Sequence, residues 1–264
     1  MRTLRFDRDG TMLIAEQRDG DGPPIVIVPG VMSDAHAWRP VVSFLTLPNP
    51  VVVLNRRGRV PSGPLGPGYS VRTEIDDLHH VLDALGQDVE LFGWSFGGLI
   101  ALEAATERRG LRSVVAYEPV SSPFGTDAIE PLRAAQDAGD LDQAVAIVNR
   151  TVSGFSAEYV DALKESPVWP ALRPLAHPLA EELAALNSHR AALRRYREID
   201  APVTLLLGEF NGGKPPYGTA FEVFRQALPQ ARHLRLPGQG HLAHAEVPDL
   251  LANHLAEAIA DRPA

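Results

Sequence analysis

A serine flanked by glycines stands between a short apolar run and a helix-like apolar segment. The stretch reads Gly93-Trp94-Ser95-Phe96-Gly97-Gly98 and follows the run Val89 to Phe92. A serine on such a strand-to-helix turn presents its hydroxyl at the carboxyl edge of a sheet, and the glycines let strand and helix approach closely. The backbone N–H of the next residue, Phe96, then faces the same point and can bind an oxyanion. We therefore predict that Ser95 is a nucleophile.

A serine hydroxyl reacts readily only when a base removes its proton, so the chain must also supply a histidine and a group that orients it. His241 follows the short strand-like run Leu234–Leu236 and a turn that contains two glycines. This position predicts a histidine at the exit of a strand, and we expect His241 to be the base. His244 is the nearby alternative and is expected to be a surface residue or a neighbour of the base.

The elements that would position these residues form an alternating pattern. Short apolar runs rich in β-branched residues alternate with helical segments such as Val71–Leu85, which predicts a mostly parallel sheet with helices on both faces. Asp9-Gly10 joins the first two strands and is typical of a hairpin turn. We expect eight strands, at residues 2–6, 11–16, 25–28, 51–54, 89–92, 113–117, 203–207 and 232–236.

The strand signal disappears between Val120 and Asp200, where an Ala- and Leu-rich stretch is broken by several prolines. We predict a helical cap over residues 120–200, and a core made of residues 1–119 and 201–264. A segment inserted there would cover the carboxyl ends of the strands, where open α/β sheets bind ligands. The cap supplies apolar candidates for a binding pocket, although Trp169 could equally pack the cap onto the core; the candidates are Phe124, Phe155, Val168, Trp169 and Leu172.

Composition limits the classes of function. The 264 residues suffice for one α/β domain with an insertion, and 33 acidic against 25 basic side chains give a formal net charge of −8. That charge disfavours nucleic acid and anionic membranes, and the local cluster Arg56-Arg57-Gly58-Arg59 is too short for a phosphate track. The chain has no cysteine, which excludes disulfides and thiolate metal sites. No signal-peptide core or stretch of ~20 apolar residues appears, so we expect a cytoplasmic protein.

With the Gly93–Gly98 turn, His241 and this order of elements in place, the chain resembles the α/β-hydrolase superfamily over essentially its full length. The resemblance implies the chain order serine, acid, histidine, with the acid usually an aspartate in the loop after the strand at residues 203–207. Here the loop reads Gly208-Glu209-Phe210-Asn211. A neutral amide at Asn211 cannot stabilise the imidazolium that forms during attack, so another carboxylate is needed.

Glu118 follows the strand at residues 113–117, a position that some members of the superfamily use for the acid. We predict Glu118 as the acid and keep Glu209 as the alternative; a surface or cap-anchoring role for Glu118 stays open. The resemblance also places Pro29-Gly30-Val31-Met32 where the family has its oxyanion loop, so we expect the N–H groups of Val31 and Phe96 to form the oxyanion hole.

A narrower resemblance, to fungal zearalenone lactonases, rests on Glu118 and on Pro167-Val168-Trp169. In those enzymes the acid is a glutamate at the place of Glu118, and a cap tryptophan at the place of Trp169 contacts the substrate. We accordingly expect Trp169 to bind substrate. Met32 and Trp94 are further candidates for substrate binding.

These observations predict a serine hydrolase that cleaves a carboxylic ester or lactone on a bulky apolar substrate such as a zearalenone-like lactone. The expected partner is a small-molecule substrate, without nucleic acid or membrane, and we expect no cofactor and no metal; a homodimer is left open. Three other reactions on the same triad stay open: C–C bond hydrolysis, cofactor-free perhydrolysis and a tailoring step in natural-product assembly. A non-catalytic binding protein on this fold is the remaining alternative, because fold alone does not fix function.

Overall fold

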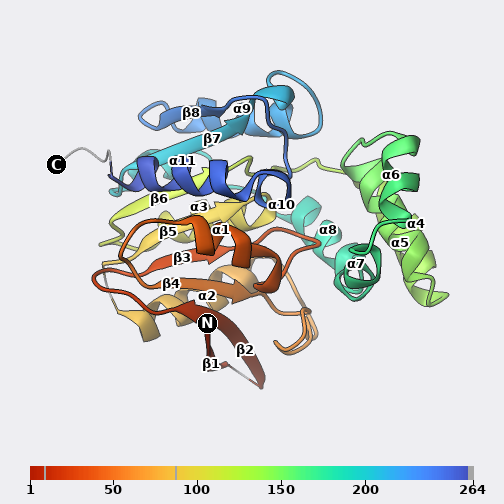
Figure 1. The fold of residues 1–264 in the computed structure, drawn as a ribbon, viewed down its shortest axis with the longest axis horizontal. Coiled ribbons are helices and arrows are strands. Elements are labelled where there is room, and N and C mark those ends of the chain that lie inside the picture. The colour runs from red at the N-terminus through yellow and green to blue at the C-terminus, as the bar shows by residue number, and fades with distance from the viewer. Residues whose placement is uncertain (9, 87, 261–264) are drawn as a thin grey trace.

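One eight-stranded sheet forms the centre of the protein (Figure 1). The computed structural model describes residues 1–8, 10–86 and 88–260. The strands are β1 (Arg2–Arg8), β2 (Thr11–Arg18), β3 (Ile25–Val28), β4 (Val51–Asn55), β5 (Glu90–Trp94), β6 (Ser113–Tyr117), β7 (Val203–Gly208) and β8 (Arg232–Leu236). Their order across the sheet is β1-β2-β4-β3-β5-β6-β7-β8, and β2 is antiparallel to both its neighbours whereas all later pairs are parallel. The predicted mostly parallel sheet is confirmed; the predicted turn at Asp9-Gly10 includes Asp9, which lies outside the described residues.

The four central strands β3 to β6 are buried along their whole length. Apolar residues predominate in all four, with Val, Ile and Leu most frequent in β3 and β4, as is typical of parallel strands that helices cover on both faces. Successive side chains point to opposite faces, so Val26 and Val28 join one hydrophobic core whereas Ile25 and Ile27 join the other. The sheet is therefore the rigid layer from whose carboxyl edge the site residues emerge.

Helices cover both faces of this sheet (Figure 1). One face carries η1 (His36–Trp38), α1 (Arg39–Phe44), α10 (Ala243–Glu246) and α11 (Pro248–Ala260), and the other carries α2 (Val71–Leu85), α3 (Phe96–Ala105) and α9 (Tyr217–Ala227). The amphipathic helix predicted at residues 71–85 is present; Ser70 begins it with a capping box to Thr73, which satisfies N–H groups at the helix start. A short turn, η5 (Glu209–Asn211), links β7 to the segment before α9.

Residues 120–200, here called the helical insertion, connect β6 to β7 and contain helices but no strand among the described residues. Figure 1 shows most of them to one side of the sheet, at the right of the view. Most prolines in this segment stand in turns or in the first turn of a helix, where a missing N–H costs little, whereas Pro174 lies inside a helix. Its helical elements are η2 (Thr126–Ala128), α4 (Ile129–Asp137), α5 (Leu141–Ile147), η3 (Val148–Val152), α6 (Ala157–Lys164), α7 (Trp169–Leu175), α8 (Leu179–Ser188) and η4 (Arg195–Glu198).

Candidate active site

Ser95 occupies a sharp turn between β5 and α3, as the glycine pattern predicts. Its backbone has φ 57° and ψ −120°, a conformation that residues with side chains rarely adopt and that is found at functional turns. A Cβ placed on Gly97 would come within 2.0 Å of the Val28 carbonyl oxygen, and one on Gly93 within 2.3 Å of the Gly97 oxygen. Only glycine fits at positions 93 and 97. The close approach of α3 to the strands therefore explains the two glycines that flank Ser95.

The loop after β3 lies directly against the serine. A Cβ on Gly30 would come within 2.8 Å of the Cβ of Ser95, so this glycine gives the loop its close approach. Arg56 then fixes the loop, because its Nε donates to the Pro29 carbonyl at 2.8 Å and its Nη2 to the Gly30 carbonyl at 3.0 Å. In a trans peptide the C=O and the following N–H point in opposite directions. The Gly30 carbonyl faces Arg56, so the N–H of Val31 faces away from it.

Phe96, the other predicted oxyanion donor, is the first residue of α3. Its N–H belongs to the first turn, where amide groups have no partner within the helix and the helix dipole favours negative charge. Val31, Ser95 and Phe96 line the same cavity. The structure therefore brings the predicted nucleophile and both predicted oxyanion donors together.

His241 and Glu118 are in direct contact. The Nδ1 atom of His241 lies 2.6 Å from Oε2 of Glu118, and both side chains are buried. The strand register explains the encounter: Trp94 pairs with Tyr117 across β5 and β6, so Ser95 and Glu118 leave the sheet side by side. Trp94 Nε1 donates to the His241 carbonyl at 3.0 Å, which ties the histidine loop to the serine strand.

The carboxylate of Glu118 is held from several sides. Its Oε1 accepts from the Gly208 N–H at 2.8 Å and from Asn211 Nδ2 at 2.9 Å, and its Oε2 accepts from Asn211 Nδ2 at 3.0 Å. Asn211, which stands where an aspartate is usual, thus donates to the glutamate. The alternative acid, Glu209, points elsewhere and accepts from the Gly238 N–H at 2.7 Å. Of the two carboxylates considered, the structure brings Glu118 to His241.

Aromatic rings enclose the His241 imidazole. Tyr217, at the start of α9, stacks on it with ring centroids 3.5 Å apart and planes 12° from parallel, and Trp94 lies at 4.8 Å. The Tyr217 hydroxyl contacts Ser153 Oγ of the helical insertion at 2.9 Å. Burial lowers the pKa of His241 below its usual range, and the Glu118 carboxylate opposes this only partly. The imidazole is therefore neutral at pH 7, as a general base must be.

His244, the alternative base, is buried behind this group. Its ring stacks on Trp38 at 5.0 Å and lies 4.1 Å from Trp94. Burial and the neighbouring His241 lower the pKa of His244 to about 3. Its Nδ1 has no hydrogen-bond partner among the described residues. The expectation that His244 lies at the surface is wrong. The other expectation, that His244 is a neighbour of the base, matches its position.

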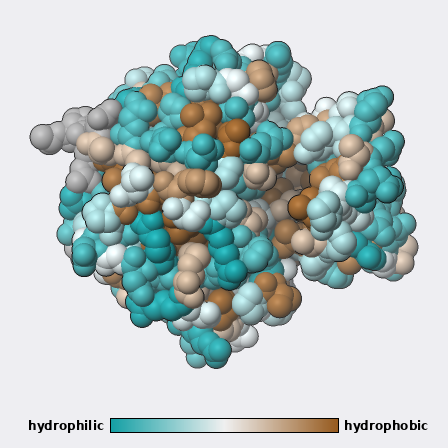
Figure 2. Space-filling model, viewed as in Figure 1, coloured by the Kyte–Doolittle hydropathy of each residue, from teal (hydrophilic) through white to brown (hydrophobic). Residues whose placement is uncertain are grey.

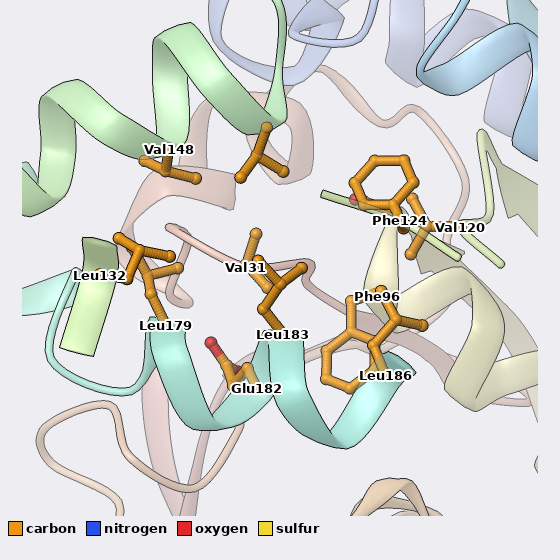
Figure 3. Close-up of a pocket in the computed structure, with 12 residues that line it drawn as sticks. Val31, Phe96, Val120, Phe124, Leu132, Val148, Leu179, Glu182, Leu183 and Leu186 are labelled. Atoms are coloured by element: carbon orange, nitrogen blue, oxygen red, sulfur yellow. The ribbon is translucent and has the colours of Figure 1, made fainter. Parts of the chain in front are cut away.

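The cavity that contains Ser95 is lined almost entirely by hydrocarbon (Figure 3). It is narrow, with a free volume of about 30 Å³, and lies between the loop of Val31, the start of α3 and the helical insertion. Figure 2 shows a recess with hydrophobic side chains at this same junction of the core with the insertion. Its lining residues are Val31, Ser95, Phe96, Val120, Phe124, Leu132, Val148, Val152, Leu179, Glu182, Leu183 and Leu186.

Several residues expected to bind substrate lie elsewhere. Trp169 is buried within the helical insertion and donates from Nε1 to Asp142 Oδ1 at 2.6 Å, so it packs helices together and does not line the cavity. Trp94 lies under the histidine loop, and Met32 packs against the core with a φ of 54°. Of the apolar insertion residues considered, Phe124 lines the cavity; the remaining ones, Phe155, Val168 and Leu172, do not.

Sequence reasoning missed two residues of the site, Tyr217 and Arg56. Tyr217 has no motif that marks it, since its stacking partner is brought by another loop. Arg56 did carry a signal, because an arginine directly after a buried strand needs a hydrogen-bond or charge partner.

Within the described residues, no three histidine or carboxylate side chains form a cluster that could hold a metal, and no helix is long and apolar enough to cross a membrane.

Comparison with known proteins agrees with this architecture. The sequence model of the alpha/beta hydrolase family matches residues 25–254, and the chain belongs to that family. It is 25% identical to 2-(acetamidomethylene)succinate hydrolase of Mesorhizobium japonicum over 91% of this chain and 89% of the relative. It is 29% identical to polyketide synthase ThaQ of Burkholderia thailandensis over 87% of this chain, which spans 11% of that much longer protein.

Solved structures share the fold. An alpha/beta hydrolase from Sphaerobacter thermophilus superposes with a TM-score of 0.81 at 29% identity, covering 97% of this chain and 99% of that one. The enol-lactonase of Burkholderia xenovorans superposes with a TM-score of 0.77 at 21% identity, covering 98% and 100%. The second likeness concerns the fold alone.

Proposed function

We propose that this chain is a serine hydrolase that cleaves an uncharged ester or lactone through an acyl-enzyme. Ser95 is the nucleophile, His241 the base, Glu118 the orienting acid, and the N–H groups of Val31 and Phe96 the oxyanion hole. The observation that carries the proposal is the contact of 2.6 Å between His241 Nδ1 and Glu118 Oε2, made beside the turn that holds Ser95. A carboxylate at Nδ1 keeps the proton there, which leaves Nε2 free to accept one.

The reaction runs in two halves. Ser95 Oγ attacks the carbonyl carbon while its proton passes to Nε2 of His241, and the carbonyl oxygen becomes an oxyanion held by the two N–H groups. His241 then gives its proton to the leaving alcohol as the C–O bond breaks, and an acyl-Ser95 ester remains. Water attacks this ester with His241 again as base, which releases the acid and restores the serine.

The cavity supports an apolar acyl group. Apart from Ser95 and Glu182, its walls are aliphatic and aromatic side chains, and a charge buried there without a partner would cost several kcal/mol. Its free volume of about 30 Å³ lies far below the ~300–1,000 Å³ found for small-molecule sites. We therefore favour a linear or branched acyl chain over a zearalenone-like macrocycle, and expect this chain not to share the succinate substrate of its Mesorhizobium japonicum relative.

A thioester substrate is the second candidate. The likeness to a segment of a polyketide synthase favours it, since such proteins build acyl chains, and the same triad would release a thiol in place of an alcohol. This reading keeps open the tailoring step in natural-product assembly.

The test is a panel of p-nitrophenyl esters, lactones and acyl thioesters of graded chain length, assayed with the wild type and with Ser95→Ala. We expect turnover of neutral apolar substrates that falls by about five orders of magnitude or more in the variant, because only oxyanion binding remains. Comparable rates for the two proteins would rule out Ser95 as the nucleophile. A preference for small charged esters would rule out the apolar acyl site.

A further inference from the structure

Glu182 is the charged residue among those that line the cavity (Figure 3). Two buried arginines, Arg56 and Arg59, bind its carboxylate. Arg59 Nη1 donates to Oε1 at 2.6 Å and Arg59 Nη2 to Oε2 at 2.7 Å, while Arg56 Nη2 donates to Oε1 at 2.7 Å. All three side chains are 0% exposed. The Arg59 contact is the forked, two-bond arrangement by which a guanidinium recognises a carboxylate.

The charges of this group are balanced. Arg56 also donates to Glu74 Oε1 at 2.7 Å, so two guanidinium groups face two carboxylates. Burial acts to raise the pKa of Glu182, but Arg59 and Arg56 outweigh it and keep that pKa below its usual range. Glu182 is therefore ionised at neutral pH. A substrate that brings a further carboxylate into the cavity finds no unmatched cation there, and its charge stays unpaired.

We infer that Arg56 and Arg59 form an anion site in the cavity wall which the carboxylate of Glu182 occupies, and that Glu182 thereby sets the preference of the cavity for uncharged acyl groups. The part about acyl groups rests on the proposed function, whereas the anion site does not. The competing explanation is that Glu182, which belongs to α8, only ties the helical insertion to the core. A structural tie alone would leave the preference for neutral acyl groups unchanged when Glu182 is removed, so the selectivity of the Glu182→Ala variant separates the two explanations.

Truncation of Glu182 would expose the site. Glu182→Ala removes the Cγ atom and the carboxylate, a fragment with the heavy atoms of acetate. Arg59 would keep its bond from Nε to the Ser33 carbonyl at 3.0 Å, and Arg56 would keep Glu74 and the two loop carbonyls. Both guanidinium groups would thus stay in place while the donors that now face Glu182 become free for a small monocarboxylate.

The first measurement is thermal unfolding of Glu182→Ala in sodium acetate, with sodium chloride and neutral acetamide as controls at equal concentration. We expect the variant to melt about 10 °C below the wild type, and about 0.2 M acetate to raise its Tm by about 3 °C or more above the chloride value. The wild type should show no such difference. Glu181→Ala is the matched control, since Glu181 is an exposed neighbour on α8 that pairs with Arg133.

Glu182→Gln provides a second variant that fills the space without the charge, and acetate should not stabilise it. If Glu182→Ala is recovered only from refolding, acetate should increase the yield where chloride does not. Equal behaviour in acetate and chloride, in melting or in refolding, would overturn the anion site and leave Glu182 as a structural tie.

The second measurement compares p-nitrophenyl pentanoate with mono-p-nitrophenyl glutarate, which differ in a terminal carboxylate. We expect the wild type to prefer the neutral ester by about a hundredfold or more in kcat/KM, and this ratio to fall by at least about tenfold in Glu182→Ala. Glu181→Ala should keep the wild-type ratio. An unchanged ratio in Glu182→Ala would refute the selectivity role, and no turnover of either ester by the wild type would instead reject the proposed function while the acetate measurement still tests the site.

Discussion

Glu118→Gln changes one oxygen of the site to an amide nitrogen and should disable the base. In the wild type, Oε1 accepts from the Gly208 N–H at 2.8 Å and Oε2 contacts His241 Nδ1 at 2.6 Å. A glutamine offers only one accepting oxygen. If that oxygen faces Gly208, the amide NH₂ faces His241 and demands an unprotonated Nδ1, so the proton moves to Nε2 and the base is lost. If the glutamine oxygen faces His241, its NH₂ group faces the Gly208 N–H, and two hydrogen-bond donors meet in a buried site.

The expected loss follows from these two orientations. The wrong tautomer and the missing countercharge for the imidazolium together cost about two to four orders of magnitude in kcat, or about 3–5 kcal/mol in the barrier. The assay is kcat and KM on a neutral p-nitrophenyl ester, with circular dichroism to verify folding. We expect KM to change little, because the glutamate does not line the cavity.

Two controls separate this explanation from a general disturbance of the loop. Glu209→Gln removes the alternative carboxylate and should change kcat less than about twofold, since the Glu209 carboxylate accepts from the Gly238 N–H and does not contact His241 within the described part of the chain. Asn211→Ala removes a donor to Glu118 and should cost less than about tenfold. A larger loss at Glu209 than at Glu118, or a Glu118→Gln enzyme within tenfold of the wild type, would refute the reasoning.

Three further predictions concern neighbouring residues. In the folded protein His244 has a pKa of about 3 and is neutral, whereas in the unfolded chain its imidazole is protonated below pH ~6.5. The free energy of unfolding therefore falls as the pH drops below ~6.5, by about 3 kcal/mol at pH 4.5. His244→Phe should remove this part of the pH dependence in urea melts, and an unchanged slope would show that another group causes it. Tyr217→Phe keeps the ring stacked on His241 and should leave kcat within about twofold of the wild type, whereas Tyr217→Ala should lower kcat about tenfold. Equal losses in the two variants would show that the hydrogen bond from the Tyr217 hydroxyl to Ser153, and not the stacking, supports His241. Trp169→Ala should cost about 3–5 kcal/mol of stability in denaturant melts without changing the order of substrate preference, and a changed order would show that Trp169 binds substrate.

Much of the fold can be read from the sequence because the sheet has a simple physical signature. Parallel strands buried on both faces must be short apolar runs, and each predicted run matches a strand to within a few residues. The contact between His241 and Glu118 was also predictable, since both follow strands whose carboxyl ends meet at one edge. The catalytic roles of these residues stay predictions.

The helical insertion shows where such reasoning ends. Its amphipathic helices have apolar faces toward each other and toward the cavity, and composition does not distinguish the two. The sequence therefore left both substrate binding and packing open for Trp169, which bonds to Asp142 within the insertion. The pairing of Arg56 with Glu182 joins residues 126 positions apart and depends on how the insertion folds back on the core. The local sequence pattern does not predict such a contact.

The central claim is that Ser95 is an activated nucleophile, and active-site labelling tests it most directly. The folded protein is treated with a fluorophosphonate, and the adduct is located by intact mass and peptide mapping. We predict one adduct per chain on Ser95, none in Ser95→Ala, and slower labelling in His241→Ala and Glu118→Gln because the base is lost or misdirected. A folded wild-type protein that takes up no label, or takes it up on another residue, would contradict the account.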